Sequence, residues 1–113
     1  LQFGQYDITA MSTPGHTDGC MSFIVGDKVF TGDALLIRSC GRCDFQGGSA
    51  AKLFDSISQL FTLPDETYVY PAHDYGGRTV SSIWEEKAFN EMIGAGVDKA
   101  EFVRRVNAME LSL

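Results

Sequence analysis

The chain has 113 residues, a common length for a single domain, and its hydrophobic fraction of 44% is typical of a globular protein and not of a disordered one. Fifteen acidic and nine basic residues give a net charge of −6, which disfavours a general nucleic-acid-binding function because phosphate neutralisation requires a basic surface. No apolar stretch approaches the roughly 20 residues that a membrane-spanning helix needs, and residues 1–6 lack the features of a signal peptide.

The first half of the chain shows mainly strand and turn signals. Residues 6–11 are predicted to form a strand, and residues 20–25 and 28–31 a β-hairpin joined by a short turn that contains glycine. A loop rich in glycine and polar residues is expected over residues 32–48. Loops of this length are usually functional or disordered, so this segment is a candidate for a functional site.

A helix and a short strand are predicted next. Ser49 is expected to cap the start of the helix, and Pro64 and Asp65 to end it. Residues 67–70 are rich in β-branched and aromatic side chains and predict a strand. Helical spacing places five apolar side chains of the helix on one face: Leu53, Phe54, Ile57, Leu60 and Phe61.

Two further helices are predicted after this strand, over residues 80–93 and 98–111. In the second of them Asp98 and Glu101 fit a capping box. The order of strands, followed by alternating helix and strand, predicts an α/β or α+β fold. The apolar members of the two helices are Ile83, Trp84 and Phe89 in the first, and Phe102, Val103, Val106 and Met109 in the second.

The three cysteines, Cys20, Cys40 and Cys43, are an odd number at irregular spacing. Cys40 and Cys43 form a C-x-x-C pair inside the glycine-flanked loop, but the second pair that a zinc ribbon requires is absent from the sequence. We therefore expect reduced thiols.

Three potential metal ligands lie where predicted strands end: His16, Asp33 and His73. Because the ends of strands in one sheet share an edge, these side chains can converge on a metal or catalytic site. Taken singly, each is more often a surface histidine or a turn-forming aspartate. Two histidines and one carboxylate also match the facial triad of non-haem iron oxygenases.

The predicted loop also contains candidate substrate-binding residues. Arg38 and Arg42 carry guanidinium groups whose donor geometry suits a substrate carboxylate. The alternative for Arg42 is a surface ion pair with Asp44. Tyr75 either offers its phenol to the same pocket or packs against the protein.

Several motifs of this chain resemble those of a known enzyme superfamily. The sequence TPGHT at residues 13–17 and FTGD at residues 30–33 resemble the C-terminal half of the metallo-β-lactamase superfamily. Residues 32–46 (GDALLIRSCGRCDFQ) and 70–75 (YPAHDY) are similar to the persulfide dioxygenases, or sulfur dioxygenases, the family of the ethylmalonic-encephalopathy protein. The first two motifs are specific to the superfamily, and the last two are specific to this subfamily.

The resemblance implies an iron enzyme of sulfide catabolism that oxidises glutathione persulfide with dioxygen and water to sulfite and glutathione. It implies His16 and Asp33 as ligands of one ferrous ion, and His73 as the remnant histidine of a second metal position. It also implies Arg42 and Tyr75 as contacts for glutathione. Such an enzyme is expected to be intracellular and soluble, in the bacterial cytoplasm or the mitochondrial matrix, with a homodimer as one option for its assembly.

The chain departs from the family pattern in its loop and in its extent. Ser39 and Cys43 stand where the family usually has Gly and Thr. The H-x-H-x-D-H motif that supplies the family's third iron ligand does not occur among these residues. We therefore expect the C-terminal half of an αββα sandwich, inactive by itself. One face of its sheet is then built to meet the first half, so that residues 20–25 expose core surface.

Two alternatives remain open at this point. One is a glyoxalase-II-like thioester hydrolase with two metal ions, zinc among the options, in which Asp33 bridges the ions and His73 binds the second. The other is a truncated half-domain without catalysis that acts as a binding or structural piece.

Overall fold

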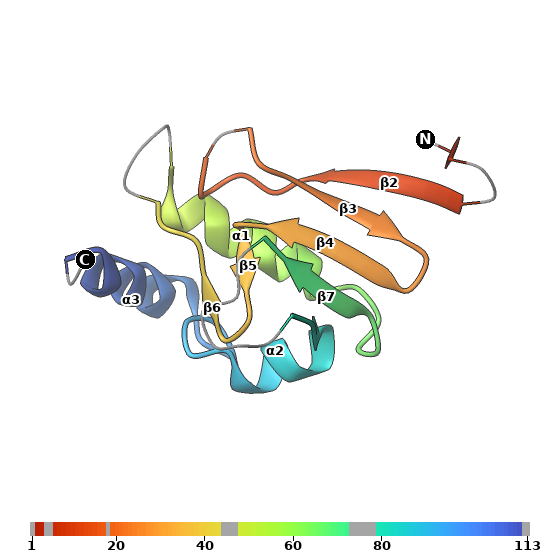
Figure 1. Cartoon of the computed structure of the whole chain (residues 1–113). Helices are drawn as coiled ribbons and strands as arrows, with labels where there is room; N and C mark the ends of the chain where they lie inside the picture. Colours follow the sequence, from red (N-terminus) through yellow and green to blue (C-terminus); the bar gives the residue numbers. More distant parts are fainter. Residues whose placement is uncertain (1, 4–5, 18, 44–47, 73–78, 112–113) are drawn as a thin grey trace.

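The computed structural model describes residues 2–3, 6–17, 19–43, 48–72 and 79–111. Within them a six-stranded sheet forms one layer, and helix α1 covers one of its faces (Figure 1). The strands of this sheet, in spatial order, are β1 (Gln2–Phe3), β2 (Tyr6–Ser12), β3 (Met21–Val25), β4 (Lys28–Gly32), β7 (Tyr68–Pro71) and β8 (Ser81–Ser82).

The sheet mixes antiparallel and parallel pairs. β2, β3 and β4 form an antiparallel meander, as the turn signals predicted, while β4 and β7 run parallel. A parallel pair needs a crossover connection, and α1 (Ala50–Leu60) provides it. These features confirm the predicted mixture of helices and strands.

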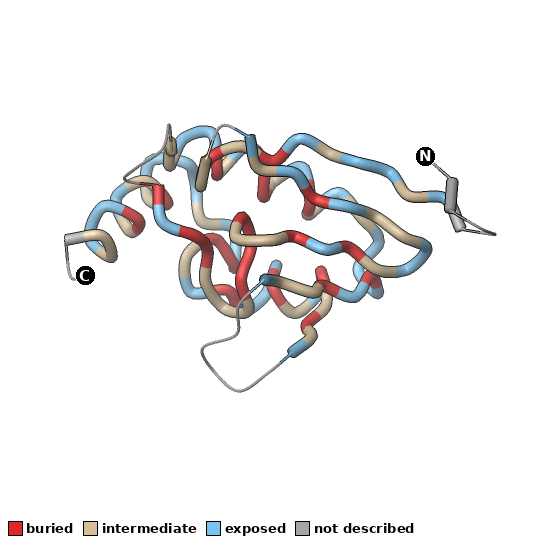
Figure 2. The backbone as a smooth tube through the Cα atoms, turned by 45° about the horizontal axis from the view of Figure 1, so that its top comes forward, coloured by how far each residue is buried: buried red, intermediate tan, exposed pale blue. Residues whose placement is uncertain are grey.

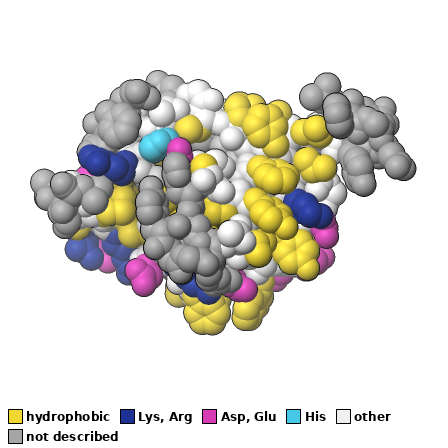
Figure 3. Space-filling model, in the orientation of Figure 1, with side chains coloured by type: hydrophobic (Ala, Val, Ile, Leu, Met, Phe, Trp, Pro, Cys, Tyr) yellow, Lys and Arg dark blue, Asp and Glu magenta, His cyan; other side chains and the backbone are white. Residues whose placement is uncertain are grey.

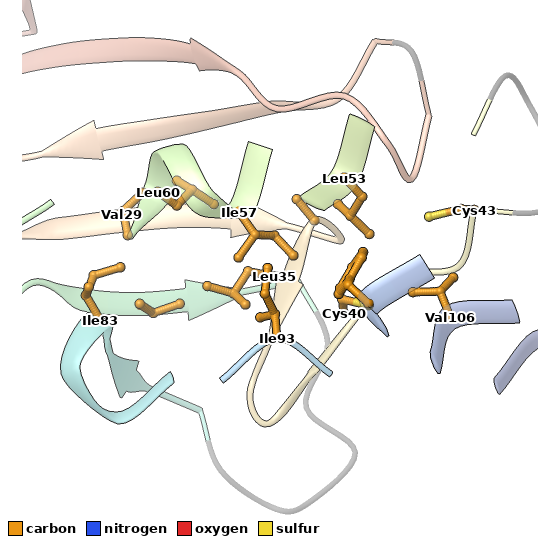
Figure 4. Packing of buried hydrophobic residues seen from close by; sticks show 13 residues of the cluster. Val29, Leu35, Cys40, Cys43, Leu53, Ile57, Leu60, Ile83, Ile93 and Val106 are labelled. Carbon is orange, nitrogen blue, oxygen red and sulfur yellow. The ribbon is translucent and has the colours of Figure 1, made fainter. Parts of the chain in front are cut away.

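Helix α1 forms as its sequence predicts. The Ser49 side chain accepts a hydrogen bond from the Lys52 N–H (3.2 Å), which caps the first turn. The apolar stripe of the helix then packs on the inner face of the sheet, and α3 packs alongside it (Figure 4). The core residues contributed by these elements include Val29, Val69, Leu53, Ile57, Leu60, Phe102 and Val106.

The expected loop over residues 32–48 is partly wrong, because its described residues contain a second, two-stranded sheet. β5 (Leu35–Leu36) and β6 (Ser39–Cys40) pair as an antiparallel hairpin. Leu35, Leu36 and Cys40 are buried, so hydrophobic burial orders a segment whose glycine content indicated a loop.

The helix predicted over residues 80–93 is shorter than expected. It begins as strand β8, continues as α2 (Ile83–Phe89) and ends at Asn90. Ile83 is buried, but Trp84 and Phe89 are exposed and contact each other edge to face, with ring centroids 5.8 Å apart. Of the three apolar members of this predicted helix, only Ile83 therefore belongs to the core.

Helix α3 (Lys99–Leu111) matches its prediction more closely. The Asp98 carboxylate accepts a hydrogen bond from the Glu101 N–H (2.9 Å), while the Glu101 carboxylate turns to Arg104 (2.6 Å). Only the first half of the predicted capping box is thus made by these side chains. In the predicted apolar stripe, two side chains are fully buried and two are half-buried: Phe102 and Val106, and Val103 and Met109.

The face of the sheet opposite α1 carries large apolar side chains. Met21, Phe23, Phe30 and Tyr68 are between 40% and 47% exposed, and the register places Phe23 beside Phe30. Phe30 also stacks on Tyr70, with ring centroids 5.3 Å apart. Figure 3 shows hydrophobic side chains gathered over these strands, and Figure 2 shows exposed positions alternating with buried ones along them. The expectation that residues 20–25 expose core-like surface is confirmed.

The cysteines carry free thiols, as expected, and Cys40 and Cys43 are buried. Burial, followed by the nearby charges of Cys43 and Glu110, raises the pKa of the Cys40 thiol well above its usual range. Cys40 therefore behaves as an apolar core side chain and not as a nucleophile.

Among the described residues, no helix combines the length and the apolar character needed to span a bilayer.

Candidate metal centre

The turn that carries His16 is held against the start of α1. The Gly15 carbonyl accepts a hydrogen bond from the Ser49 N–H (2.6 Å), and the Pro14 carbonyl accepts one from the Ser56 hydroxyl (2.7 Å). Gly15 has φ +141°, and a Cβ at this position would collide with Leu53. The glycine of the T-P-G sequence is thus required for the turn to lie this close to the helix.

Asp33 directly follows β4, at the sheet edge where β4 and β7 both end. Gly32 pairs with Pro71, and the Ala72 N–H donates a hydrogen bond to the Gly32 carbonyl (2.9 Å). The ends of β4 and β7 therefore lie side by side, as predicted, with Asp33 following one strand and Ala72 the other. His73 follows next in the sequence but lies outside the described residues.

The structure brings His16 and Asp33 together. His16 Nε2 lies 3.6 Å from Asp33 Oδ2, and the two side chains are 19% and 32% exposed. The other ring nitrogen, Nδ1, lies 2.6 Å from the carbonyl oxygen of Arg42, which can only accept a hydrogen bond. Nδ1 therefore carries a proton, and in the neutral imidazole Nε2 has its lone pair on the side of Asp33.

This geometry fits a metal ion. Atoms that each bind one ion at about 2.0–2.2 Å can lie up to roughly 4 Å apart, so the separation of His16 Nε2 and Asp33 Oδ2 suits a shared ion. A backbone carbonyl that accepts the second ring proton is the usual partner of a metal-bound histidine. Within the described part of the chain, no group of three His, Cys, Asp or Glu side chains is placed to hold a metal. These two donors thus form part of a ligand set.

Gly41 is a site residue that the sequence reasoning did not single out. A Cβ at this position would lie 2.9 Å from His16 Nδ1 and would collide with the carbonyl oxygen of Asp33. Only glycine lets the segment after β6 pass this close to both candidate ligands. The glycine of the C-G-R sequence was the available signal.

Arg42 contributes to the site through its backbone carbonyl, which orients His16, while the residue as a whole is exposed. Its predicted role as a substrate contact remains a prediction. Asp44, its alternative partner, and Tyr75, the second predicted glutathione contact, both lie outside the described residues.

Arg38, the other arginine of the predicted loop, forms ion pairs within the protein. Its guanidinium group lies 2.6 Å from the carboxylate of Glu86 and 3.1 Å from that of Glu85. The same side chain lies over the Phe89 ring, 5.6 Å from its centroid. Arg38 therefore joins the tip of the β5–β6 hairpin to α2.

Glu86 is the centre of this junction and was also missed by the sequence reasoning. Its carboxylate is fully buried and accepts hydrogen bonds from the Arg38 N–H (2.7 Å), the Ser81 hydroxyl (2.6 Å) and the Asn90 amide (2.9 Å). The Asn90 amide also donates to the carbonyl of Ser39 (3.0 Å). These bonds hold in place the hairpin that leads from Asp33 to Gly41. A glutamate within a predicted helix gave no signal for this role.

The fold and the site agree with a comparison of sequences. Residues 3–73 match the Metallo-beta-lactamase superfamily, and the chain belongs to this superfamily. Membership implies a metal cofactor, in accord with the paired His16 and Asp33.

The curated relatives include the mitochondrial persulfide dioxygenase ETHE1 of Bos taurus, which is 45% identical over 98% of this chain and 44% of that protein. A probable metallo-hydrolase of Burkholderia pseudomallei is 36% identical over 100% of this chain and 44% of that protein. A crystal structure of ETHE1 from Myxococcus xanthus superimposes with a TM-score of 0.92 and 53% identity, over 96% of this chain and 48% of that one. The chain thus spans about half the length of the relatives it matches, and it fits their C-terminal half.

Proposed function

We propose that this chain supplies the C-terminal half of a non-haem iron persulfide dioxygenase, which oxidises glutathione persulfide with dioxygen and water to sulfite and glutathione. The single observation that carries the proposal is the pairing of His16 Nε2 with Asp33 Oδ2, with the His16 tautomer set by the Arg42 carbonyl. One imidazole and one carboxylate supply two members of a facial triad. The similarity to persulfide dioxygenases of cattle and Myxococcus xanthus supports this choice of activity.

In this proposal His16 and Asp33 bind the iron, and the remaining half of the domain provides the third ligand. His73, which follows β7 in the sequence, is assigned to the second metal position of the superfamily. When bound, ferrous iron supplies the redox chemistry with dioxygen that amino-acid side chains cannot provide. The protein residues hold the ligand geometry, keep His16 in the Nδ1–H tautomer and bind the thiol carrier.

Arg42 is proposed to bind glutathione, together with Tyr75. Arg42 is exposed and follows Gly41 directly, so its side chain leaves the backbone beside the His16–Asp33 pair. Glutathione carries two carboxylates, and a guanidinium group binds a carboxylate through two parallel hydrogen bonds.

The apolar face of the sheet is proposed to pack against the other half of an αββα sandwich. Met21, Phe23, Phe30 and Tyr68 give this face the character of a protein core. The described histidine, His16, lies on the same side of the molecule (Figure 3). A second sheet packed there would cover the apolar side chains and bring its own ligands to the metal, so the chain alone is expected to be inactive.

The direct test is an assay of the full-length protein, loaded with Fe²⁺, in an oxygen electrode. Glutathione persulfide should cause oxygen uptake with formation of sulfite, and omission of iron should abolish it. The hydrolase alternative predicts the opposite pattern: cleavage of glutathione thioesters by the zinc-loaded protein and no oxygen uptake with persulfide.

Two variants should separate substrate binding from metal binding. Arg42→Ala is expected to raise KM for glutathione persulfide about tenfold or more with little change in iron content, because only the guanidinium group is lost and the backbone carbonyl stays. Asp33→Asn should lose iron, because a neutral amide replaces a charged ligand. Steady-state kinetics and metal analysis measure both effects. Equal iron loss in the two variants would assign Arg42 a structural role.

A further inference from the structure

One peptide group at the site is hydrogen-bonded at both of its ends. The carbonyl of Arg42 accepts a bond from His16 Nδ1 (2.6 Å), and the N–H of Cys43, in the same peptide unit, donates to Glu110 Oε1 (2.7 Å). Both distances are at the short end of the normal range for bonds of this type. A continuous chain of hydrogen bonds thus runs from the Glu110 carboxylate, through a peptide group, to the imidazole of a candidate metal ligand.

Glu110 lies in an unusual place for an acidic residue. It is in the last turn of α3, where the helix dipole disfavours negative charge, and that turn contains no basic residue. The helix is anchored further back, where Phe102 contacts Phe54 of α1 and Val106 is buried. Glu110 is therefore not explained by helix stability, and its carboxylate points at the Arg42–Cys43 peptide from a segment 67 residues away.

We propose that Glu110 is a positioning residue of the metal centre, acting on His16 through the Arg42–Cys43 peptide. A charged acceptor on the N–H polarises the peptide and strengthens its carbonyl as an acceptor. A stronger hydrogen bond from Nδ1–H to this carbonyl makes Nε2 a better electron-pair donor to a metal ion and fixes the plane of the ring. The proposal rests on the assignment of His16 as a metal ligand.

The alternative is that Glu110 serves only to accept the hydrogen bond from the buried Cys43 N–H. That role requires an acceptor oxygen in the right place but no negative charge. Glu110→Gln keeps the shape and an acceptor oxygen while removing the charge, so this variant separates the two roles. A matched control is Glu101→Gln, which makes the same change on the same helix at a carboxylate that pairs with the exposed Arg104.

The test measures metal affinity and not turnover. Full-length protein is prepared without metal and titrated with Co²⁺ against a competing chelator, and the Nδ1–H resonance of His16 is recorded by NMR in the Zn²⁺-loaded protein. We expect Glu110→Gln to weaken Co²⁺ binding about tenfold, the low end for partners outside the ligand set, and to shift the resonance. Glu101→Gln should change neither quantity.

Wild-type affinity and an unshifted resonance in Glu110→Gln would overturn the proposal. His16→Ala, measured alongside, tests the assignment on which it rests. If that variant loses Co²⁺ while Glu110→Gln does not, only the role of Glu110 fails. If His16→Ala binds Co²⁺ normally, the proposed ligand set fails and the role of Glu110 fails with it.

Discussion

Gly41→Ala is expected to remove most of the bound metal, with a fall in affinity of about 10–100-fold. The added methyl group would collide with the Asp33 carbonyl and lie 2.9 Å from His16 Nδ1, so the two candidate ligands would be pushed from their present positions. Overpacking of this kind also costs about 1–3 kcal/mol of unfolding free energy. The φ of Gly41 is outside the left-handed region, so the expected effect is steric and not conformational.

Gly19→Ala is the matched control, because a Cβ at Gly19 would meet no atom within 4 Å. Metal analysis and thermal unfolding of the two full-length variants give the comparison. The control should retain its metal and its melting temperature. Retention of metal by Gly41→Ala at the wild-type level would mean that the loop does not pass against the ligands as the structure shows.

Glu86→Ala is expected to lower the free energy of unfolding by about 3–5 kcal/mol. The substitution removes a fully buried carboxylate and leaves the Arg38 guanidinium, the Ser81 hydroxyl and the Asn90 amide without this partner. Two of these three partner residues, Ser81 and Asn90, are themselves buried, so water cannot readily replace the lost hydrogen bonds.

The neighbouring Lys87→Ala serves as the control, because Lys87 forms an exposed ion pair with Asp65 (3.1 Å). Exposed pairs of this kind contribute about 0–1 kcal/mol. Urea unfolding of the full-length protein measures both variants. Similar losses for Glu86→Ala and Lys87→Ala would show that the buried network contributes little to stability.

Local sequence signals predicted the elements that depend on neighbouring residues. The meander, the capped helix after Ser49 and the helix after Asp98 all formed close to their expected bounds. Their hydrophobic spacing and capping residues act within a few positions along the chain, where sequence alone holds the information. The β5–β6 hairpin and the short α2 were mispredicted, because burial against distant segments overrode their local composition.

The candidate ligands were also recognisable from sequence, since His16 and Asp33 lie in short motifs next to strand ends. The residues that position these ligands were harder to recognise from the sequence. The Arg42 carbonyl and Glu110 carry no local signal for their roles, and the hydrogen bond that brings Glu110 to the site joins it to Cys43, 67 residues earlier in the chain. The glycine of C-G-R was the one available signal for Gly41.

The sequence by itself determined the class of this protein: a mixed α and β chain of the metallo-β-lactamase superfamily with an acidic balance and two motifs that carry candidate metal ligands, TPGHT and FTGD. The tertiary structure decided which nitrogen of His16 faces Asp33, because the Arg42 carbonyl accepts a hydrogen bond from the other nitrogen, Nδ1. It also decided that Arg38 pairs with Glu86 and Glu85. Hydrogen bonds and burial depend on which distant groups the fold brings together, and spacing along the chain does not contain that information.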